Sequence, residues 1–409
     1  MMPSTAASKT PNPLLKVSRM LRRLASALDG DHLSGRELTA ADELAGFLRR
    51  PAICLPSEPV HGLVGGRRVL VTGAGGTIGS ELCRQIASCD PASLVMVDRY
   101  ENGLHAVALD LAGRASVHPV VGDITDPQRL DDIVSGARPE IVLHAAAHKH
   151  VPLMERNPGE AMKNNIVGTR MVVDAAIRCR AARFVLISTD KAVRPSSVMG
   201  ATKRAAELIV QRAARDSQTR CAIVRFGNVL GSNGSVFHTF QSQVRAGGPV
   251  TVTHPDVRRF FMLVHEAVQL VLHAAAAAPQ GAIAVLDIGN QIPIIELAHY
   301  VIRLAGLTPN VDVPIVFTGL RPGEKLDEEL VGEGEHLKPS RVDGIGWVAA
   351  PERHDWLAFT RHLGVLESLA FEGLADDARL ALNRLLEPFG GVHASAALHP
   401  AQYVAATAS

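Results

Sequence analysis

The sequence predicts an α/β protein whose parallel sheet is covered by helices on both faces, and two observations support this fold class. Short apolar runs rich in β-branched residues recur from Arg67 onward, and most of them end in glycine or polar residues. They are "RRVLVTGAGG", "SLVMVDR", "VHPVVGD", "EIVLHAAA", "RFVLIST" and "CAIVRFG". Stretches with helical periodicity separate these runs. Strands that alternate with helices are typical of a doubly wound parallel sheet.

This alternation divides the chain into four expected parts. Residues 1–65 are expected to form a helical extension and a linker, and residues 66–227 hold the regular alternation of strands and helices. Residues 228–387 are expected to form mainly a smaller α/β lobe, because the pattern becomes irregular there, although the run "AVLDIG" should return to the sheet. Residues 388–409 lack periodicity and are expected to be a disordered tail.

The N-terminal extension contains the segment "LLKVSRMLRRLASAL". Its apolar residues recur at helical spacing, namely Leu14, Val17, Leu21, Leu24 and Leu28. Its basic residues lie on the other side of that helix, namely Lys16, Arg19, Arg22 and Arg23. Such a helix can bind an anionic membrane surface or pack its apolar stripe on protein. We favour packing on protein.

The bulk composition argues against several classes of protein. The formal net charge is +1 and aromatic residues make up 4%, so a nucleic-acid-binding surface is not expected. The stretch "AVQLVLHAAAAA" is shorter than the roughly 20 apolar residues of a membrane-spanning helix, and no secretory signal is evident. The five cysteines form no CxxC pair and are expected to be reduced thiols of a cytoplasmic protein.

A glycine-rich turn predicts a cofactor site. Gly73, Gly76 and Gly79 occur at GxxGxxG spacing in "VLVTGAGGTIGSELCRQI", after a strand and at the start of a helix. In a dinucleotide-binding turn, glycines let the backbone approach the pyrophosphate, and the helix N-terminus faces its charge. Thr77 and Ile78 belong to the same turn. The sequence therefore predicts a Rossmann-type domain over residues 66–227 that binds NAD, with NADP as the alternative.

The ends of the next strands are expected to complete this cofactor site. Asp98 closes "LVMVD" about 20 residues after the glycines, where an acid can bind the ribose hydroxyls. Its charge favours NAD over NADP, but the neighbouring Arg99 can reverse that preference. Further contacts are expected from Asp123 and Ile124 near the adenine, and from Ala145 and Ala146 beside the cofactor.

A second polar cluster indicates where a reaction takes place. Ser188, Thr189, Asp190 and Lys191 end the strand "RFVLISTDK", and polar groups at such strand ends face the ligand crevice. Met199 and Lys203 follow on one face of the next helix. Lys203 stands at the lysine of a YxxxK signature and is expected, with Ser188, to contact the cofactor. Met199 replaces the tyrosine, and a thioether cannot transfer a proton.

These stretches resemble a known family. Together with "AAAHKHVPLME", "RFGNVLGSNGSV", "GGPVTVTHPDVRRFFM" and "TGLRPGEKLDEEL", they are similar to the polysaccharide-biosynthesis (CapD-like) branch of the extended short-chain dehydrogenase/reductases. The UDP-N-acetylglucosamine 4,6-dehydratases are the members that the chain resembles most. The resemblance spans roughly residues 67 to 332, and methionine at the tyrosine position is a mark of this branch. It also implies a homo-oligomer.

The resemblance implies a mechanism for the reaction site. Similar enzymes oxidise carbon 4 of the sugar, eliminate water across carbons 5 and 6, and return the hydride to carbon 6. Asp190 would protonate the leaving hydroxyl, and Lys191 would be the base for carbon 5 if Lys203 and burial lower its pKa. Thr189 would hydrogen-bond the carbon-4 oxygen, whose proton would leave through a water or Asp190.

The resemblance also implies substrate contacts in the smaller lobe and near it. Lys149 and His150 would face the sugar or its N-acetyl group, and Asn228 would contact the diphosphate. Arg259 and Arg321 would pair with diphosphate oxygens, and Glu324 would bind the nucleoside ribose. Asp327 stands where the family is expected to have an aromatic residue.

Several alternatives stay open at this point. They are a dehydratase with 5-epimerase activity, a nucleotide-sugar 4-epimerase, and an NAD(P)-sensing protein without catalysis. Retention of Thr189, Asp190, Lys191 and Lys203 argues against the sensing protein. No metal site is predicted, because His144, His148 and His150 have no acidic or cysteine ligand beside them.

Overall fold

The computed structural model describes residues 44, 46–48, 50, 52–114, 116–349 and 355–392. The expected amphipathic helix around Leu14 to Leu28 lies outside these residues. Among the described residues, no helix combines the length and the apolar character that a membrane crossing requires.

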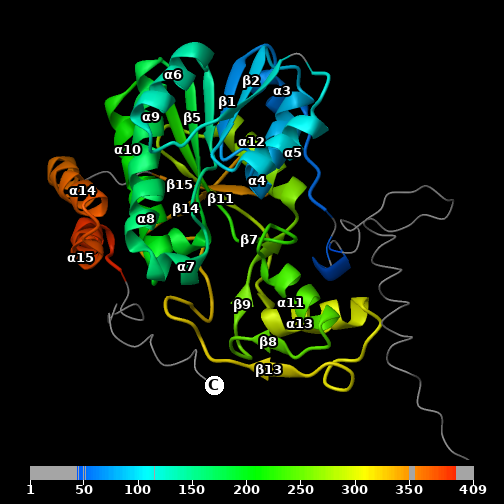
Figure 1. Ribbon diagram of the computed structural model, residues 1–409. Helices are drawn as coiled ribbons and strands as arrows, with labels where there is room; N and C mark the ends of the chain where they lie inside the picture. The colour runs from blue at the N-terminus through cyan, green and yellow to red at the C-terminus, as the bar shows by residue number, and fades with distance from the viewer. Residues whose placement is uncertain are drawn as a thin grey trace, which may run out of the picture.

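One large sheet forms the centre of the molecule (Figure 1). Its nine strands run in the order β14-β15-β11-β6-β5-β4-β1-β2-β3. The strands are β1 (Arg68–Thr72), β2 (Ser93–Asp98), β3 (Val117–Val121), β4 (Ile141–His144), β5 (Arg183–Ile187), β6 (Arg220–Arg225), β11 (Ile283–Leu286), β14 (Leu337–Pro339) and β15 (Ile345–Val348). The neighbouring strands β11-β6-β5-β4-β1-β2-β3 are all parallel. At the edge, β15 pairs antiparallel with β11, and β14 pairs antiparallel with β15. The predicted α/β Rossmann-type fold is confirmed, including the return of "AVLDIG" to the sheet as β11.

Helices cover both faces of this sheet and create two apolar cores. One face carries α3 (Glu58–Val64), α4 (Thr77–Ala87), α5 (Glu101–Asp110) and α12 (Val264–Ala277). The other carries α6 (Pro127–Ala137), α9 (Thr169–Arg178) and α10 (Val198–Asp216). Neighbouring residues of β5 point to opposite cores, Phe184 into the second and Val185 into the first, because side chains alternate along a strand. Hence β5 is buried along its whole length.

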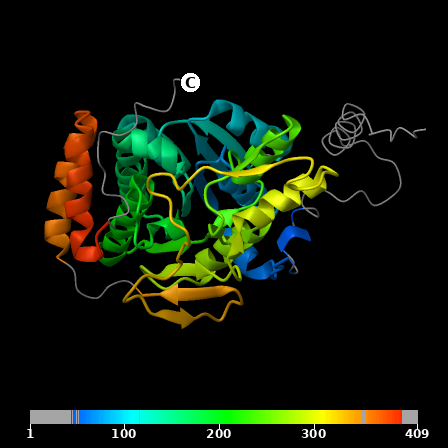
Figure 2. The ribbon, with the colours of Figure 1, turned by 90° about the horizontal axis from the view of Figure 1, so that it is seen from below.

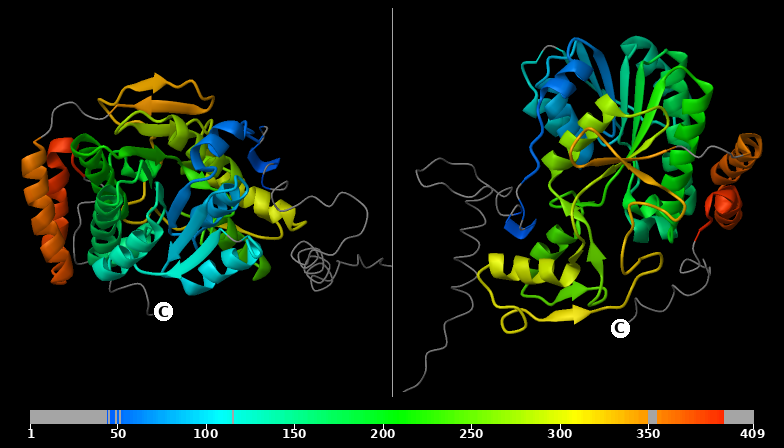
Figure 3. Two further views of the ribbon diagram at one scale, coloured as in Figure 1. Left: turned by 90° about the horizontal axis from the view of Figure 1, so that it is seen from above. Right: turned by 180° about the vertical axis from the view of Figure 1, so that it is seen from behind.

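A smaller lobe lies beyond the carboxyl ends of the strands (Figure 1 and Figure 3, right). It holds α11 (Val236–Arg245), α13 (Ile294–Leu304) and three short pairs of strands. The pairs are β7 (Asn228–Val229) with β10 (Phe261–Met262), β9 (Arg258–Arg259) with β12 (Ile292–Pro293), and β8 (Val250–Val252) with β13 (Ile315–Phe317). Its own core is built around buried side chains such as Phe240 and Leu297.

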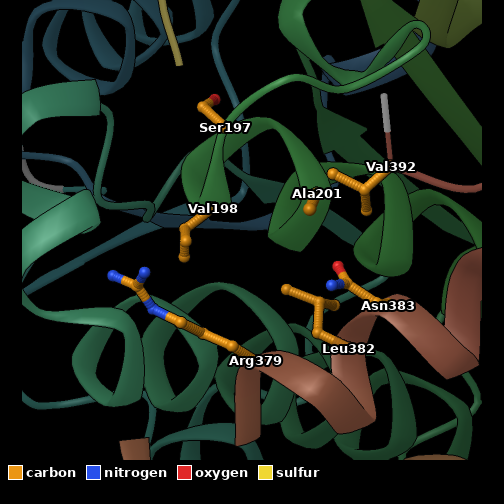
Figure 4. Close-up of a pocket in the computed structure, with 7 residues that line it drawn as sticks. All are labelled: Ser197, Val198, Ala201, Arg379, Leu382, Asn383 and Val392. Carbon is orange, nitrogen blue, oxygen red and sulfur yellow. The ribbon is translucent and has the colours of Figure 1, made fainter. Parts of the chain in front are cut away.

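Two C-terminal helices depart from the expected domain boundaries. The helices α14 (Trp356–Phe371) and α15 (Ala375–Leu386) pack on each other and on α10 and α8 (Pro158–Met162), far from the smaller lobe (Figure 2). In Figure 4, Leu382 and Asn383 of α15 face Ala201 of α10. These two helices, although within the range 228–387, therefore pack as part of the sheet domain, because their apolar faces are buried there.

The expected tail also begins later than predicted. A 3-10 helix, η3, spans Glu387–Phe389, and its Phe389 ring packs against Trp356 and Phe359 of α14. Aromatic contacts thus hold a segment whose sequence has no periodicity. Residues 393–409 of the predicted tail lie outside the described part of the chain.

Candidate active site

The site lies where the parallel strands end. Gly73 follows β1, Ala145 follows β4 and Ser188 follows β5, so the sequence cues from three distant segments meet at one edge of the sheet. Asn228 follows β6 by three residues and opens the smaller lobe. Because all these strands are parallel, their carboxyl ends share this edge, which is the ligand crevice of such sheets.

A cavity of about 210 Å³ opens at the glycine turn. Eight of the predicted cofactor residues line it: Gly73, Gly76, Asp98, Arg99, Asp123, Ile124, Ala145 and Ala146. The lining also includes residues that the sequence interpretation missed: Val97, Tyr100, Gly122, Ala147, His148 and Asn164. Tyr100 directly follows Arg99, so proximity in sequence could have indicated it, whereas Asn164 comes from a separate π-helical turn, Lys163–Gly168.

The glycines fit a dinucleotide through close backbone contacts. Gly73 has φ +74°, and a Cβ there would lie 2.5 Å from the Ala146 nitrogen. A Cβ on Gly79 would lie 1.9 Å from the Gly73 carbonyl oxygen, so Gly79 lets α4 pack against the turn and does not line the cavity. The N-cap residue of α4, Gly76, lines the cavity, so the N-terminus of this helix can face a pyrophosphate there. Thr77 itself accepts a hydrogen bond from the Asn233 backbone through Oγ1, and Ile78, like Thr77, is not part of the lining.

Asp98 and Arg99 take different positions in the cavity wall. The Asp98 carboxylate accepts hydrogen bonds from the Gly75 and Tyr100 backbone N–H groups, both at 2.8 Å. The Arg99 guanidinium contacts Asp123 at 3.2 Å and the His148 ring at 2.7 Å. Burial alone would raise the pKa of Asp123, but hydrogen bonds from Thr125 and Arg99 outweigh it and lower that pKa. The wall thus offers a carboxylate and a guanidinium side by side at the expected ribose position.

Ser188 and Lys203 lie behind this cavity and do not line it. Lys203 is buried on α10 and donates from Nζ to the Ile187 carbonyl oxygen at 2.7 Å. Burial lowers the pKa of Lys203 to about 8, against the attraction of Glu207. Ser188 donates from Oγ to Glu207 at 2.6 Å. Both predicted cofactor contacts are therefore used inside the protein in this structure.

A buried ion network that sequence analysis missed supports the end of β5. Glu207 is fully buried and accepts from Arg225 at 2.7 and 2.8 Å. Arg225 also donates to Glu335 at 2.6 and 2.9 Å. Burial would raise the pKa of Glu207, but Arg225 outweighs it and holds that pKa at about 2. No motif marked these residues, because they are scattered over α10, β6 and the segment before β14.

The predicted reaction groups come together at the end of β5. The Lys191 ammonium lies 3.0 Å from Asp190 Oδ1 and 3.1 Å from Asn228 Oδ1. Thr189 donates from Oγ1 to the same Asp190 oxygen at 2.8 Å. Asp190 is fully buried, and its Oδ2 finds no hydrogen-bond partner among the described residues. A buried carboxylate with one unused oxygen is an acceptor that a ligand can satisfy.

Lys191 was expected to act as a base if Lys203 and burial lower its pKa, and this condition is not met in the structure. Burial would lower the pKa of Lys191, but attraction by Asp190 and by Glu328, 3.5 Å away, raises it above its ordinary value. Lys203 is not a cause of this shift, because its amine is turned to the Ile187 carbonyl group. Lys191 is thus an ammonium ion held between two carboxylates. Glu328 was missed because it stands in an acidic stretch without a distinctive spacing.

Met199 has an apolar environment. It is buried at the start of α10 with Met154, Ala161 and Val198 around it. This cluster explains a side chain of this size and polarity at the tyrosine position through packing. A catalytic role for Met199 stays a prediction.

The predicted substrate residues differ in how free their side chains are. Arg259 is buried, and its two terminal nitrogens donate to the carbonyl groups of Arg258, Lys325 and Leu326. Glu324 accepts from Thr253 at 3.1 Å and from the Arg321 backbone at 3.2 Å. Arg321 itself is exposed.

Lys149 and His150 follow β4 and reach toward the smaller lobe. A Cβ on Gly234, in the loop before α11, would lie 2.7 Å from the His150 ring, so the two loops are in close contact. Desolvation lowers the pKa of Lys149, and desolvation together with Lys149 lowers the pKa of His150. His150 thus stands where the loop after β4 meets the smaller lobe.

The three histidines do not meet as a cluster. His144 is buried in β4 between Thr72 and Thr169, at 2.7 and 2.9 Å. Thr169 donates to the Asn165 carbonyl oxygen, so it accepts from His144 Nε2, and burial lowers the pKa of this histidine to about 3. His144 is therefore a neutral structural residue. Across the described ranges, no group of three or more His, Cys, Asp or Glu side chains is arranged to hold a metal ion.

Comparisons with known proteins agree with this architecture. The chain is 48% identical over 304 residues to the probable polysaccharide biosynthesis protein EpsC of Bacillus subtilis, covering 73% of this chain and 50% of that protein. It is 31% identical over 277 residues to a UDP-N-acetylglucosamine 4,6-dehydratase (inverting) of Campylobacter jejuni, covering 66% of this chain and 79% of that enzyme. The chain thus spans about half the length of EpsC.

A solved structure and a family model give the same picture. The X-ray structure of Pen from Bacillus thuringiensis matches with a TM-score of 0.66 and 30% identity, covering 70% of this chain and 90% of that one. The family model for polysaccharide biosynthesis proteins matches residues 69–349, which include the glycine turn, the reaction cluster and the smaller lobe. Because this match covers well over half of the chain, the protein belongs to the family of polysaccharide biosynthesis proteins.

Proposed function

We propose that this protein is a nucleotide-sugar 4,6-dehydratase that acts on UDP-N-acetylglucosamine and forms a 4-keto-6-deoxy sugar. The observation that carries the proposal is the cluster of Thr189, Asp190 and Lys191 at the end of β5, at the same edge of the sheet as the cavity at the glycine turn. Elimination needs an acid and a base on one substrate, and this cluster offers a carboxyl group and an amine 3.0 Å apart. The Campylobacter jejuni relative carries this activity in its name.

A nicotinamide dinucleotide fits the glycine cradle and, when bound, would accept the hydride from carbon 4 and later return it to carbon 6. Gly73, Gly76 and Asp98 would hold it, because their backbone and carboxylate groups line the cavity. NAD is the favoured form, since Asp98 opposes a 2′-phosphate. NADP is the alternative, since Arg99 stands beside it.

Because no tyrosine is present at position 199, Asp190 would accept and later release the proton of the carbon-4 hydroxyl group. Its free Oδ2 would take the proton of the carbon-4 hydroxyl group, and Thr189 would hold the resulting carbonyl oxygen. Asp190 would then give this proton to the carbon-6 hydroxyl group, which leaves as water. The proton released by oxidation is thus the one that elimination consumes, and Asp190 returns to its carboxylate form within the same turnover.

Lys191 would remove the proton of carbon 5, which the neighbouring ketone makes acidic. Its amine is fixed by Asp190 and Asn228, so it can stand over one face of the sugar ring. The smaller lobe would bind the nucleotide. Arg321 is the better candidate for a diphosphate oxygen than Arg259, because Arg321 is exposed, whereas Arg259 is buried and donates to backbone carbonyl groups.

The test is incubation of the purified protein with UDP-N-acetylglucosamine and NAD or NADP in deuterated water, followed by mass spectrometry and NMR. The expected product has lost one water and carries deuterium at carbon 5. Asp190→Asn should reduce its formation by at least about 100-fold. Asp343→Asn, which changes an exposed residue that no part of the mechanism uses, should not. If Asp190→Asn turned over as fast as the unmodified protein, the proposed role of Asp190 in proton transfer would be rejected.

The configuration at carbon 5 of the product separates two versions of this function. The relative from Campylobacter jejuni is named as inverting, which supports a dehydratase with 5-epimerase activity as the second candidate. NMR coupling constants of the deuterated product distinguish retention from inversion. Release of a 4-epimer without loss of water would instead identify a 4-epimerase. Cofactor binding without any sugar conversion across a substrate panel would favour the sensing protein.

A further inference from the structure

Lys191 is surrounded by four charged groups that come from three different segments. Asp190 stands in the 3-10 helix η2 (Asp190–Ala192), Arg259 stands in β9, and Lys325 and Glu328 stand in the segment after β13. Glu328 lies 3.5 Å from the Lys191 ammonium and 3.8 Å from the Arg259 guanidinium. Lys191 therefore contacts one carboxylate from its own segment and one from the far side of the site.

The position of Glu328 is fixed by Gln291. The Gln291 side-chain amide donates to the Glu328 carbonyl oxygen at 3.0 Å, and its oxygen accepts from the Glu328 N–H group at 3.2 Å. Gln291 directly precedes β12, which pairs with β9 and hence with Arg259. This bracket holds the Glu328 backbone on both sides, so its carboxylate is directed at Lys191 by a rigid support.

The Glu328 carboxylate can also accept a further hydrogen bond. It is 4% exposed, and its Oε2 has no hydrogen-bond partner within the described part of the chain. Asp190 Oδ2 is in the same situation on the other side of Lys191. A buried, unpaired carboxylate oxygen is costly, and its presence at a fixed position calls for a functional explanation.

We propose that Glu328 is the proton partner of Lys191, taking a proton from its ammonium ion during turnover and so producing the free amine that removes the carbon-5 proton. This inference rests on the proposed dehydratase function and adds a residue to it. Glu328 acts through Lys191 and is therefore a positioning residue for the base.

The trigger is the protonation of Asp190. Once Asp190 takes the carbon-4 proton, one of the two negative charges that hold the proton on Lys191 is gone. In a desolvated site the remaining ammonium–carboxylate pair can then neutralise itself by proton transfer. This order ties deprotonation of carbon 5 to prior oxidation of carbon 4, which is when the carbon-5 proton has become acidic.

The proton balance closes over one turnover. A Lys191 N–H bond breaks as a Glu328 O–H bond forms, and the free amine then takes the carbon-5 proton. Asp190 releases its proton to the departing water. When the hydride returns to carbon 6, Lys191 returns a proton to carbon 5. Glu328 finally gives its proton back to Lys191, so all three groups end as they began.

The first measurement is made on the protein alone, without substrate. NMR of protein labelled with ¹³C at lysine Cε, with Lys191 assigned through Lys191→Arg, follows the titration of this amine. Glu328→Gln should lower the pKa of Lys191, because a nearby negative charge that favours the ammonium ion is removed. Asp327→Asn should leave it unchanged. An unchanged Lys191 titration in Glu328→Gln would overturn the proposal and would not affect the proposed function.

The second measurement follows turnover in deuterated water. The relay predicts that Glu328→Gln incorporates deuterium at carbon 5 at least about 100-fold more slowly, although its Lys191 has the lower pKa. The 4-keto sugar that keeps its carbon-6 hydroxyl group should accumulate, because oxidation uses Asp190. If Glu328 only stabilised the ammonium ion, the variant would exchange carbon 5 as fast as the unmodified protein or faster, which would refute the relay.

A third variant distinguishes the loss of proton transfer from misfolding. Glu328→Asp keeps the carboxylate one methylene further from Lys191 and should restore part of the exchange rate that Glu328→Gln loses. Equal losses in both variants, with normal folding by circular dichroism, would count against proton transfer. Failure of the unmodified protein to convert any nucleotide sugar would reject the proposed function itself, while the Lys191 titration would still decide whether Glu328 controls its charge.

Discussion

The contribution of Lys203 to the free energy of unfolding should rise with pH. Lys203 is 5% exposed, and burial lowers the pKa of its amine from 10.5 to about 8. Between these two values the unfolded chain holds a proton on this lysine that the folded protein lacks. Stability therefore increases as the pH rises, because the unfolded state binds more protons. The full difference corresponds to about 3 kcal/mol, since each pH unit between the two pKa values contributes about 1.36 kcal/mol.

The perturbation that isolates this effect is Lys203→Met. Urea denaturation of both proteins at pH 7 and at pH 10 gives the difference between their free energies of unfolding. This difference should move by about 2.5 kcal/mol in favour of the unmodified protein between pH 7 and pH 10. Lys338→Met, which removes an exposed lysine of β14, controls for the loss of an amine as such. A difference that stays constant with pH would refute the reasoning that burial lowers the pKa of Lys203.

Three further predictions test separate parts of the structure. Glu207→Gln should lower the free energy of unfolding by about 3–5 kcal/mol in chemical denaturation, because it leaves buried Arg225 without one of its two carboxylates, and exposed Glu333→Gln should not. Gly79→Ala should weaken NAD binding at least about tenfold in calorimetry, because its Cβ would overlap the Gly73 carbonyl oxygen; Gly136→Ala, with open space around it, is the control. Met199→Leu should keep turnover and change stability by less than about 1.5 kcal/mol, and a large loss of turnover would show that the sulfur has a chemical role.

The sheet domain was largely predictable because its signals are local. Each apolar run that ends in glycine or a polar residue became a strand, and the order of the runs is enough for a doubly wound sheet. The α14–α15 pair was not predictable in its location. Its apolar periodicity indicates helices, but nothing in the residues around Trp356 or Leu382 says which surface they cover. Only the three-dimensional arrangement of α8 and α10 provides that surface.

Residues of the candidate site that are close together in the sequence could be named in advance. The glycine turn could be named from its spacing, and the contiguous cluster Thr189, Asp190 and Lys191 from its position at the end of a strand. The charge state of Lys191 could not be predicted. It depends on Glu328, more than a hundred residues away in the chain, and this carboxylate outweighs the effect of burial only together with Asp190. The same limitation hid Glu207 and Arg225, which meet through packing of α10 on β6.

The loss of the tyrosine can be understood from what the proposed reaction requires of its protons. In a simple oxidation the proton of the hydroxyl group must leave the site, and a tyrosine linked to a lysine suits that task. In a dehydration the same proton is needed again one step later at carbon 6. A buried carboxylate with one free oxygen can hold it in between, which is the environment of Asp190. In the proposed mechanism Asp190 accepts that proton, and the cluster around Met199 consists of apolar side chains that do not accept protons.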